Sequence, residues 1–141
     1  MVRINILNPK SLSDQHLIAE YDEILMLLGY VRKYPKKENI PENYTLGKGH
    51  IRFFKDKLIY LKERYELIKK EMKKRGFRAE VTFEITEFDL TLRNGWLPGK
   101  EDREIIKKRI IEKIKMKPDY YRYYRKKADS AFLIDLIKKA E

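Results

Sequence analysis

One stretch near the N-terminus combines the residue types that acid–base chemistry requires. His16, Glu20 and Glu23 are spaced four and three residues apart, which on an α-helix places the three side chains on one stripe. Because the apolar residues of this segment recur on the other side, we expect the stripe to face solvent. A histidine with two carboxylates could bind a metal ion. Without a second histidine or a cysteine nearby, a solvated, ion-paired helix face is the favoured interpretation.

A second stretch interleaves aromatic rings with cations. Between residues 120 and 127, four tyrosines alternate with two arginines and two lysines. In nucleic-acid-binding proteins, cations contact phosphates while aromatic rings stack on bases. The segment therefore predicts a nucleic-acid contact, although some of these tyrosines are expected to pack on the core instead.

The glycine-rich turn LGKGH, residues 46–50, precedes a predicted helix and could hold a phosphate at the helix N-terminus. It matches neither of the common nucleotide-binding motifs. We therefore expect His50 to be a helix cap or a buried, hydrogen-bonded histidine rather than a catalytic residue.

Composition narrows the class of protein. Among 141 residues, 33 Lys and Arg stand against 22 Asp and Glu, a formal charge of +11, which favours a polyanionic partner such as nucleic acid. Richness in Lys and Glu is also typical of heat-adapted proteins, but heat adaptation does not require so large a net charge. The absence of cysteine excludes disulfides, thiolate zinc sites and cysteine nucleophiles.

No apolar run is long enough to span a bilayer, and the first residues lack the apolar region of a signal peptide. We therefore expect a cytoplasmic protein with no membrane contact. The length is typical of one domain, so residues 1–141 are expected to form a single compact unit.

Helical periodicity and end signals predict an all-α domain of three main helices with an added short C-terminal helix. The main helices are expected at about residues 13–32, capped by Ser11 or Ser13, at 49–75, ended by Gly76, and at 101–116, ended by Pro118. Residues 79–90 alternate like a strand without a pairing partner, which predicts an irregular segment or a short hairpin.

The short C-terminal helix is expected from about residue 130, capped by Asp129 or Ser130, within an extension covering residues 127–141. Two sets of apolar side chains are expected to face the core. In the third main helix they are Ile105, Ile106, Ile110, Ile111 and Ile114, and in the C-terminal helix Phe132, Leu133, Leu136 and Ile137.

Five blocks of the sequence resemble, in the same order and at similar spacing, the pyrimidine-dimer DNA glycosylase/lyase family of the bacteriophage endonuclease V type. The blocks are MVRIN (1–5), DQHLIAEYDE (14–23), VRK (31–33), LGKGHIRFFKDKLIYLKERYELIKKEMKKRGF (46–77) and RIIEKIKMKPDYYRYYRK (109–126). Residues 79–108 match poorly. The resemblance implies a compact fold of three main helices, with the N-terminus threading between them toward the DNA-binding face.

The resemblance also implies a mechanism that needs no metal or cofactor. Met1 is removed, and the α-amine of Val2 attacks the deoxyribose C1′ of the damaged nucleotide, forming an imine that allows β-elimination of the strand. An α-amine, with a pKa of about 8, is far more often neutral at physiological pH than a lysine, as a nucleophile must be. The family's essential carboxylate corresponds to Glu23, which would stabilise the cationic sugar and assist proton transfer.

The partner implied is double-stranded DNA containing damaged or abasic nucleotides, bound by a monomer that kinks the duplex and flips out a base opposite the lesion. The residues expected to contact DNA are Arg3, Gln15, His16, Arg32, Lys33, Arg109, Lys113, Tyr120, Tyr121, Arg122, Tyr123 and Tyr124.

The sequence departs from the family pattern beside the expected carboxylate. The family type has arginines where this chain has Asp22 and Met26. Two alternatives therefore stay open: a lyase acting on abasic sites or a glycosylase for a different damaged base, and a non-catalytic helical module that binds DNA or RNA.

Overall fold

The computed structural model describes residues 3–141, so Val2, the expected nucleophile, lies outside the described residues. Within this range the protein is mostly helical, which confirms the predicted all-α class. The helices are α1 (Asp14–Lys33), α2 (His50–Phe54), α3 (Leu58–Lys74), α4 (Lys100–Met116) and α5 (Ser130–Lys139). Two short strands that were not predicted, β1 (Arg122–Tyr123) and β2 (Lys126–Lys127), pair as an antiparallel hairpin between α4 and α5.

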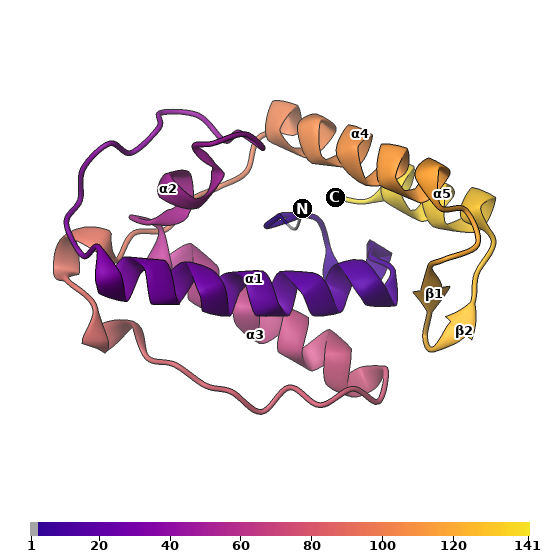
Figure 1. Cartoon of the computed structure of the whole chain (residues 1–141), viewed down its shortest axis with the longest axis horizontal. Helices are drawn as coiled ribbons and strands as arrows, with labels where there is room; N and C mark the ends of the chain where they lie inside the picture. Colours follow the sequence, from indigo (N-terminus) through magenta and orange to yellow (C-terminus); the bar gives the residue numbers. More distant parts are fainter. Residues whose placement is uncertain (1–2) are drawn as a thin grey trace.

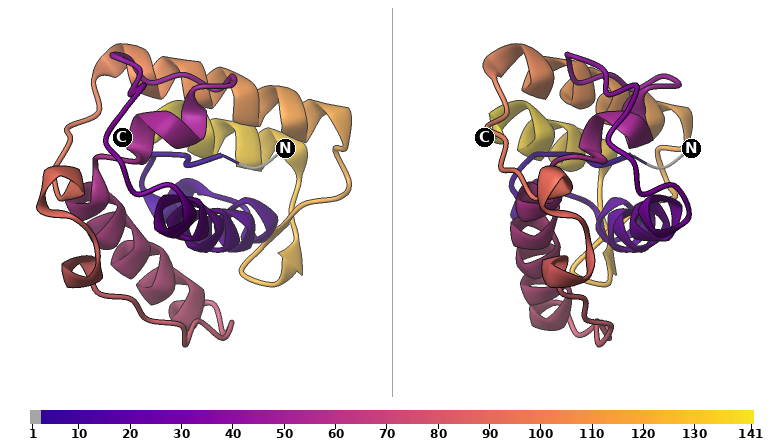
Figure 2. Two further views of the ribbon diagram at one scale, coloured as in Figure 1. Left: turned by 60° about the vertical axis from the view of Figure 1, so that its left-hand side comes forward. Right: turned by 90° about the vertical axis from the view of Figure 1, so that its left-hand side faces the viewer.

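The helices form two layers with the N-terminal segment between them. Helix α1 lies against α3, while α4 and α5 lie side by side on the other side of the molecule (Figures 1 and 2). The segment before α1 runs between α1 and the α4–α5 layer, and the β1–β2 hairpin lies beside the N-terminal end of α1. No helix within residues 3–141 combines the length and the apolar character that a membrane span requires.

Helix α1 begins where its cap predicts. Ser13 Oγ accepts a hydrogen bond from the His16 backbone N–H, which satisfies one of the free donors of the first turn. The prediction that the polar stripe of this helix faces solvent is wrong, because Glu20 is fully buried and Glu23 is 7% exposed. The N-terminal segment covers this side of α1, where Glu20 accepts hydrogen bonds from the Asn5 backbone N–H and from Arg64.

The predicted second helix, residues 49–75, is interrupted. Helix α2 ends at Phe54 and α3 begins at Leu58. At the break, the Asn94 carbonyl oxygen accepts hydrogen bonds from the N–H groups of Ile59 and Tyr60 at 3.2 and 3.4 Å, and Asn94 Nδ2 donates to the Asp56 carbonyl. These contacts come from a distant part of the chain, which is why local periodicity did not indicate the interruption.

The C-terminal end of α3 agrees with the prediction. Gly76 follows the helix with a φ of +90°, in the left-handed region that glycine adopts without steric cost. The segment that follows is irregular, with two short 3₁₀ turns, Ile85–Glu87 and Leu90–Leu92, and it is anchored by the buried side chains of Phe83, Phe88 and Leu92.

Helix α4 has the predicted extent but a narrower buried face. Ile106, Ile110 and Ile114 are buried, whereas Ile105 is 41% exposed, so its predicted inward position is wrong. A helix of an outer layer buries one stripe, and residue 105 falls outside the i, i+4, i+8 positions of that stripe.

Helix α5 begins after its cap, Asp129, and packs against α4. Leu133 and Ile137 are buried, as expected, but Phe132 remains 47% exposed. The backbone N–H of Asn8 donates a hydrogen bond to the carbonyl oxygen of Glu141 at 2.9 Å. The residue that follows α5 by two positions therefore also holds the segment that precedes α1.

Candidate nucleic-acid interface

The N-terminal segment is fixed by buried side chains from several elements. His50, at the start of α2, accepts a hydrogen bond at Nε2 from the Ile4 backbone N–H at 2.9 Å, while Nδ1 donates to the Thr45 carbonyl at 2.8 Å. The Tyr44 hydroxyl donates to the Ile4 carbonyl at 2.9 Å. Burial lowers the pKa of His50 to about 4, so the imidazole is neutral and can accept at Nε2. His50 is thus a buried, hydrogen-bonded histidine, as predicted.

The next residues of the segment are held by a buried ion pair. Arg64 of α3 donates from Nε and Nη2 to the two carboxylate oxygens of Glu20 at 2.6 and 2.9 Å. Glu20 also accepts from the Asn5 backbone N–H at 3.1 Å, and Arg64 donates to the Leu7 carbonyl. Both charged groups are buried and saturated with partners, so the pair joins α1, α3 and the N-terminal segment.

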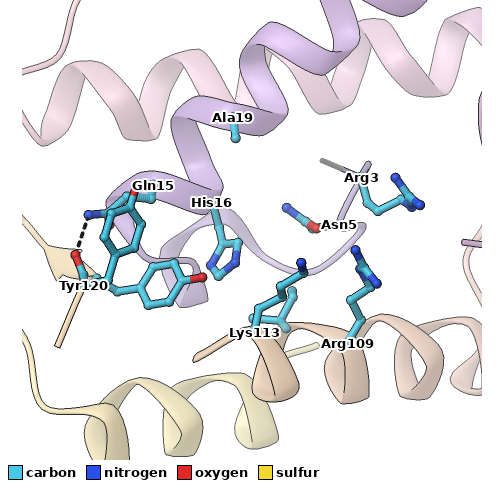
Figure 3. A pocket seen from close by; sticks show the side chains of 10 residues that line it. Arg3, Asn5, Gln15, His16, Ala19, Arg109, Lys113 and Tyr120 are labelled. Atoms are coloured by element: carbon cyan, nitrogen blue, oxygen red, sulfur yellow. Dashed lines mark hydrogen bonds between the residues drawn. The ribbon is translucent and has the colours of Figure 1, made fainter. Parts of the chain in front are cut away.

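The fixed segment opens onto a cavity of about 300 Å³ between α1 and α4 (Figure 3). Arg109 and Lys113 reach into it from α4, Arg3 and Asn5 from the N-terminal segment, and His16 from α1. Its lining residues are Arg3, Asn5, Gln15, His16, Ala19, Arg109, Ile110, Lys113, Tyr120 and Tyr121. Three cations line this one hollow, an arrangement that can bind an anion such as phosphate.

His16 is held in place on both sides. Its ring stacks on that of Tyr121 with centroids 4.8 Å apart, and its Nδ1 lies 2.9 Å from Ser13 Oγ. Burial, together with the charge of Lys113, lowers the pKa of His16 to about 4. The imidazole is therefore uncharged at neutral pH and can offer a hydrogen bond but not a positive charge.

Glu23 lines a second cavity of about 410 Å³, which shares Arg3 and Ala19 with the first. The other lining residues are Asp22, Met26, Gly47, Lys48, His50 and Ile51. Burial raises the pKa of the Glu23 carboxyl, the charge of Arg3 opposes this shift, and the charge of Glu20 adds to it. A carboxyl with a raised pKa can exchange protons nearer to neutral pH, as general acid–base chemistry requires.

Arg3 connects the two cavities. Its Nε donates a hydrogen bond to the Leu46 carbonyl at 2.7 Å, which ties the N-terminal segment to the loop before α2. Burial and the neighbouring Arg109 lower the pKa of Arg3, while Glu23 raises it. Arg3 and the Glu23 carboxylate thus lie close enough together for each charge to shift the pKa of the other.

The tyrosine segment follows α4, and its rings differ in exposure. Tyr120 is 55% exposed and Tyr121 is buried against His16. The hydroxyl groups of Tyr123 and Tyr124 donate hydrogen bonds to the Lys10 carbonyl and to Glu71. Part of the set therefore packs inward, as expected, and Tyr120 presents the most open ring.

Three further predicted contact residues have partners within the protein or lie elsewhere. The Gln15 side-chain amide lines the first cavity but bonds the backbone of residues 120 and 122 at 2.9 Å each. Arg32 and Lys33 lie in the last turn of α1 and line neither cavity. Arg32 pairs with Glu87 at 2.6 Å.

Sequence reasoning missed several residues that build this site. Asn5, Tyr44, Lys48 and Arg64 were not singled out, and Glu20 was interpreted as part of a solvated face. The usable signal is that the LGKGH turn and the MVRIN block both belong to the resemblance, whose fold threads the N-terminus between the helices. The partners of a buried arginine carry no local signature.

Fold and site together define a small helical protein in which the Glu23 carboxylate lines one cavity and three cations line the cavity next to it. The model of the pyrimidine dimer DNA glycosylase family matches residues 1–85, which is more than half of the chain. The protein belongs to this family. Membership implies a DNA-repair glycosylase whose substrate is damaged DNA. The matched region includes Arg3, His16 and Glu23, whereas the contributions of α4 and the tyrosine segment lie beyond it.

Proposed function

We propose that this protein is a DNA glycosylase with abasic-site lyase activity, acting on pyrimidine dimers through an imine on the α-amine of Val2 after removal of Met1. The observation that carries the proposal is the anchoring of residues 4–7. His50 and Glu20 hold this backbone so that Arg3 lines both cavities, and Glu23 lines one of them. An amine one residue before Arg3 would then react in a hollow that contains cations and a carboxyl.

The reaction proceeds in two stages. The neutral amine forms a bond to C1′ as the bond from C1′ to the base breaks, and the departing base takes the electron pair and a proton. Opening of the C1′–O4′ bond, with protonation of O4′, gives the imine. Removal of a proton from C2′ then expels the 3′ phosphate, and water hydrolyses the imine to release the enzyme.

Glu23 serves both stages in this proposal. As a carboxylate it stabilises the positive charge that develops on the sugar and on the imine nitrogen. Its raised pKa, caused mainly by burial, favours uptake and return of the protons that O4′ and C2′ exchange. A fully solvated carboxylate would do this less readily at neutral pH.

The proposed DNA contacts follow from the charges around the first cavity. Arg3, Arg109 and Lys113 would bind phosphates, and neutral His16 would donate a hydrogen bond. Tyr120, with its exposed ring, would stack on a base. Binding of the flanking duplex by these groups would help to offset the cost of extruding a nucleotide.

The test is borohydride trapping on a duplex with a single abasic site. Reduction converts the imine into a stable covalent adduct, which we expect for the wild type and not for Glu23→Gln. Glu63→Gln, an exposed glutamate on α3, is the matched control and should trap normally. Strong trapping by Glu23→Gln would refute the role of Glu23. N-terminal mass spectrometry must find Met1 removed, since retained Met1 would contradict Val2 as nucleophile.

A specific observation favours a second candidate, a lyase or a glycosylase for a different damaged base. Asp22 and the 62% exposed Met26 line the same cavity as Glu23, where an acidic and an apolar side chain bind phosphate poorly. Parallel digestion of dimer-containing, abasic and undamaged duplexes separates the candidates. Cleavage of the abasic duplex alone would favour the lyase. Binding of all three without any adduct would favour a non-catalytic DNA-binding module.

A further inference from the structure

The turn that joins β1 to β2 has an unusual backbone. Tyr124 and Arg125 form its two central positions, with φ values of 50° and 67°. Two-residue hairpin turns in which both central residues have positive φ are normally built from Asn and Gly. Side chains with a Cβ are disfavoured in this region. Something else must therefore hold this turn in its conformation.

The first turn of α1 supplies that restraint. Asp14 Oδ1 accepts a hydrogen bond from the Tyr124 backbone N–H at 3.1 Å, and Oδ2 accepts from the Arg125 N–H at 2.7 Å. One carboxylate thus binds both central residues of the turn. Its neighbour Gln15 binds the start of the hairpin, donating to the Tyr120 carbonyl and accepting from the Arg122 N–H.

Asp14 is itself held by a buried network. Arg75 Nη1 donates to Asp14 Oδ1 at 3.0 Å, and Arg75 Nε donates to Glu71 Oε2 at 2.8 Å. The Tyr124 hydroxyl donates to the same Glu71 oxygen at 2.7 Å. Asp14 and Glu71 are about 4% exposed and Arg75 is equally buried. The hairpin is therefore fastened to α1 and to α3 through three charged side chains that are almost completely buried.

We propose that Asp14 is a positioning residue for DNA binding, which holds the segment of residues 120–125 in its binding conformation before DNA arrives. This inference rests on the proposed function, in which that segment contacts DNA. A segment that is already ordered loses less conformational entropy on binding. The exposed Tyr120 ring would then be presented at the edge of the first cavity, and the exposed Arg122 side chain would be held next to it on the hairpin.

The principal test is Asp14→Asn, assayed by equilibrium binding to an abasic-site duplex and by single-turnover imine formation at saturating DNA. The amide cannot accept from both N–H groups, so we expect about tenfold weaker binding with an almost unchanged rate at saturation, because the effect is on positioning. Asp119→Asn is the matched control. It removes the same negative charge from an exposed residue that precedes the hairpin in the sequence. Because each substitution removes one negative charge, electrostatics alone would make both variants bind the DNA phosphates more tightly.

Rescue separates positioning from general destabilisation. Glycine adopts a positive φ without strain, so a turn with Arg125→Gly needs less restraint from Asp14. The double variant Asp14→Asn, Arg125→Gly should therefore bind DNA almost as tightly as the single variant Arg125→Gly. No rescue, or an Asp14→Asn variant that binds as tightly as Asp119→Asn, would overturn the proposal.

If Asp14→Asn does not fold, Tyr124→Phe makes a milder test, because it removes only the hydroxyl bonded to Glu71. We expect it to bind two- to threefold more weakly, and wild-type affinity would overturn the proposal.

Failure of the proposed chemistry can be distinguished from failure of the positioning role of Asp14. If the wild-type protein binds the abasic duplex but forms no adduct, the imine mechanism fails while the binding comparison of Asp14→Asn with Asp119→Asn still decides the role of Asp14. If the wild type forms the adduct and the two variants bind alike, the chemistry stands and the positioning proposal fails.

Discussion

Replacing His50 with phenylalanine should loosen the anchored N-terminal segment without leaving a hole. The His50 side chain is 3% exposed, and its ring makes edge contacts with Tyr44 and Phe54 at centroid distances of 5.7 and 5.4 Å. Phenylalanine fills a similar space but neither accepts from the Ile4 N–H nor donates to the Thr45 carbonyl. Two backbone groups would then lose their only described partner at that position.

The size of the effect follows from these two groups. A buried backbone group without a hydrogen-bond partner, such as the Ile4 N–H, costs about 1–3 kcal/mol. The Thr45 carbonyl is only partly buried and costs less, and the added apolar burial of the phenyl ring offsets part of the sum. We therefore expect His50→Phe to lower the free energy of unfolding by about 2 kcal/mol, a large share of the stability of a typical domain. Tyr44→Phe, which removes one hydroxyl bonded to the Ile4 carbonyl, should cost about 1 kcal/mol.

Urea denaturation followed by Trp96 fluorescence measures this effect, because Trp96 is the single tryptophan and its ring stacks on Tyr44 at 5.8 Å. Borohydride trapping at a temperature where His50→Phe remains folded measures the functional consequence, and we expect slower adduct formation than in Tyr44→Phe. An unfolding free energy within about 0.5 kcal/mol of the wild type, which is the usual range for a neutral substitution, would refute the role of His50 as an anchor.

Three further outcomes are expected. Burial holds the pKa of His50 at about 4 in the folded state against 6.5 when unfolded, so as pH falls from 6.5 to 4 the unfolded state binds the proton first. The contribution of His50 to stability should then fall by up to about 3 kcal/mol, in the same pH range as that of His16, and urea midpoints of His50→Phe should depend less on pH. Lys113→Ala should weaken DNA binding and reduce the slope of log Kd against log salt by about 1, measured by anisotropy in a salt series; an unchanged slope would contradict a phosphate contact. Gly76→Ala should destabilise by about 1–2 kcal/mol in urea melts, because the residue has a φ of +90° and its Cβ would lie 2.9 Å from Arg125 Nη1. Gly29→Ala, within α1 and with nothing within 4 Å of the new Cβ, should instead be neutral or stabilising.

The helices were largely predictable because their signals are local. Ser13 and Asp129 cap α1 and α5, and Gly76 ends α3, through hydrogen bonds and backbone angles that involve near neighbours. The break between α2 and α3 was not predictable in this way. It depends on the Asn94 carbonyl, which reaches the first turn of α3 from more than thirty residues along the chain.

The sequence by itself determined the chemical inventory of the site: an excess of cations, no thiol, tyrosines among cations, and Glu23 on the first helix. Only the tertiary structure decided how that inventory is used. Glu20 and Glu23 occupy one stripe of α1, yet Glu20 anchors the Asn5 backbone and Arg64, while Glu23 lines a cavity. The physical reason is that burial and hydrogen-bond partners set the role of a carboxylate, and both come from the N-terminal segment and from α3, which helical spacing does not describe.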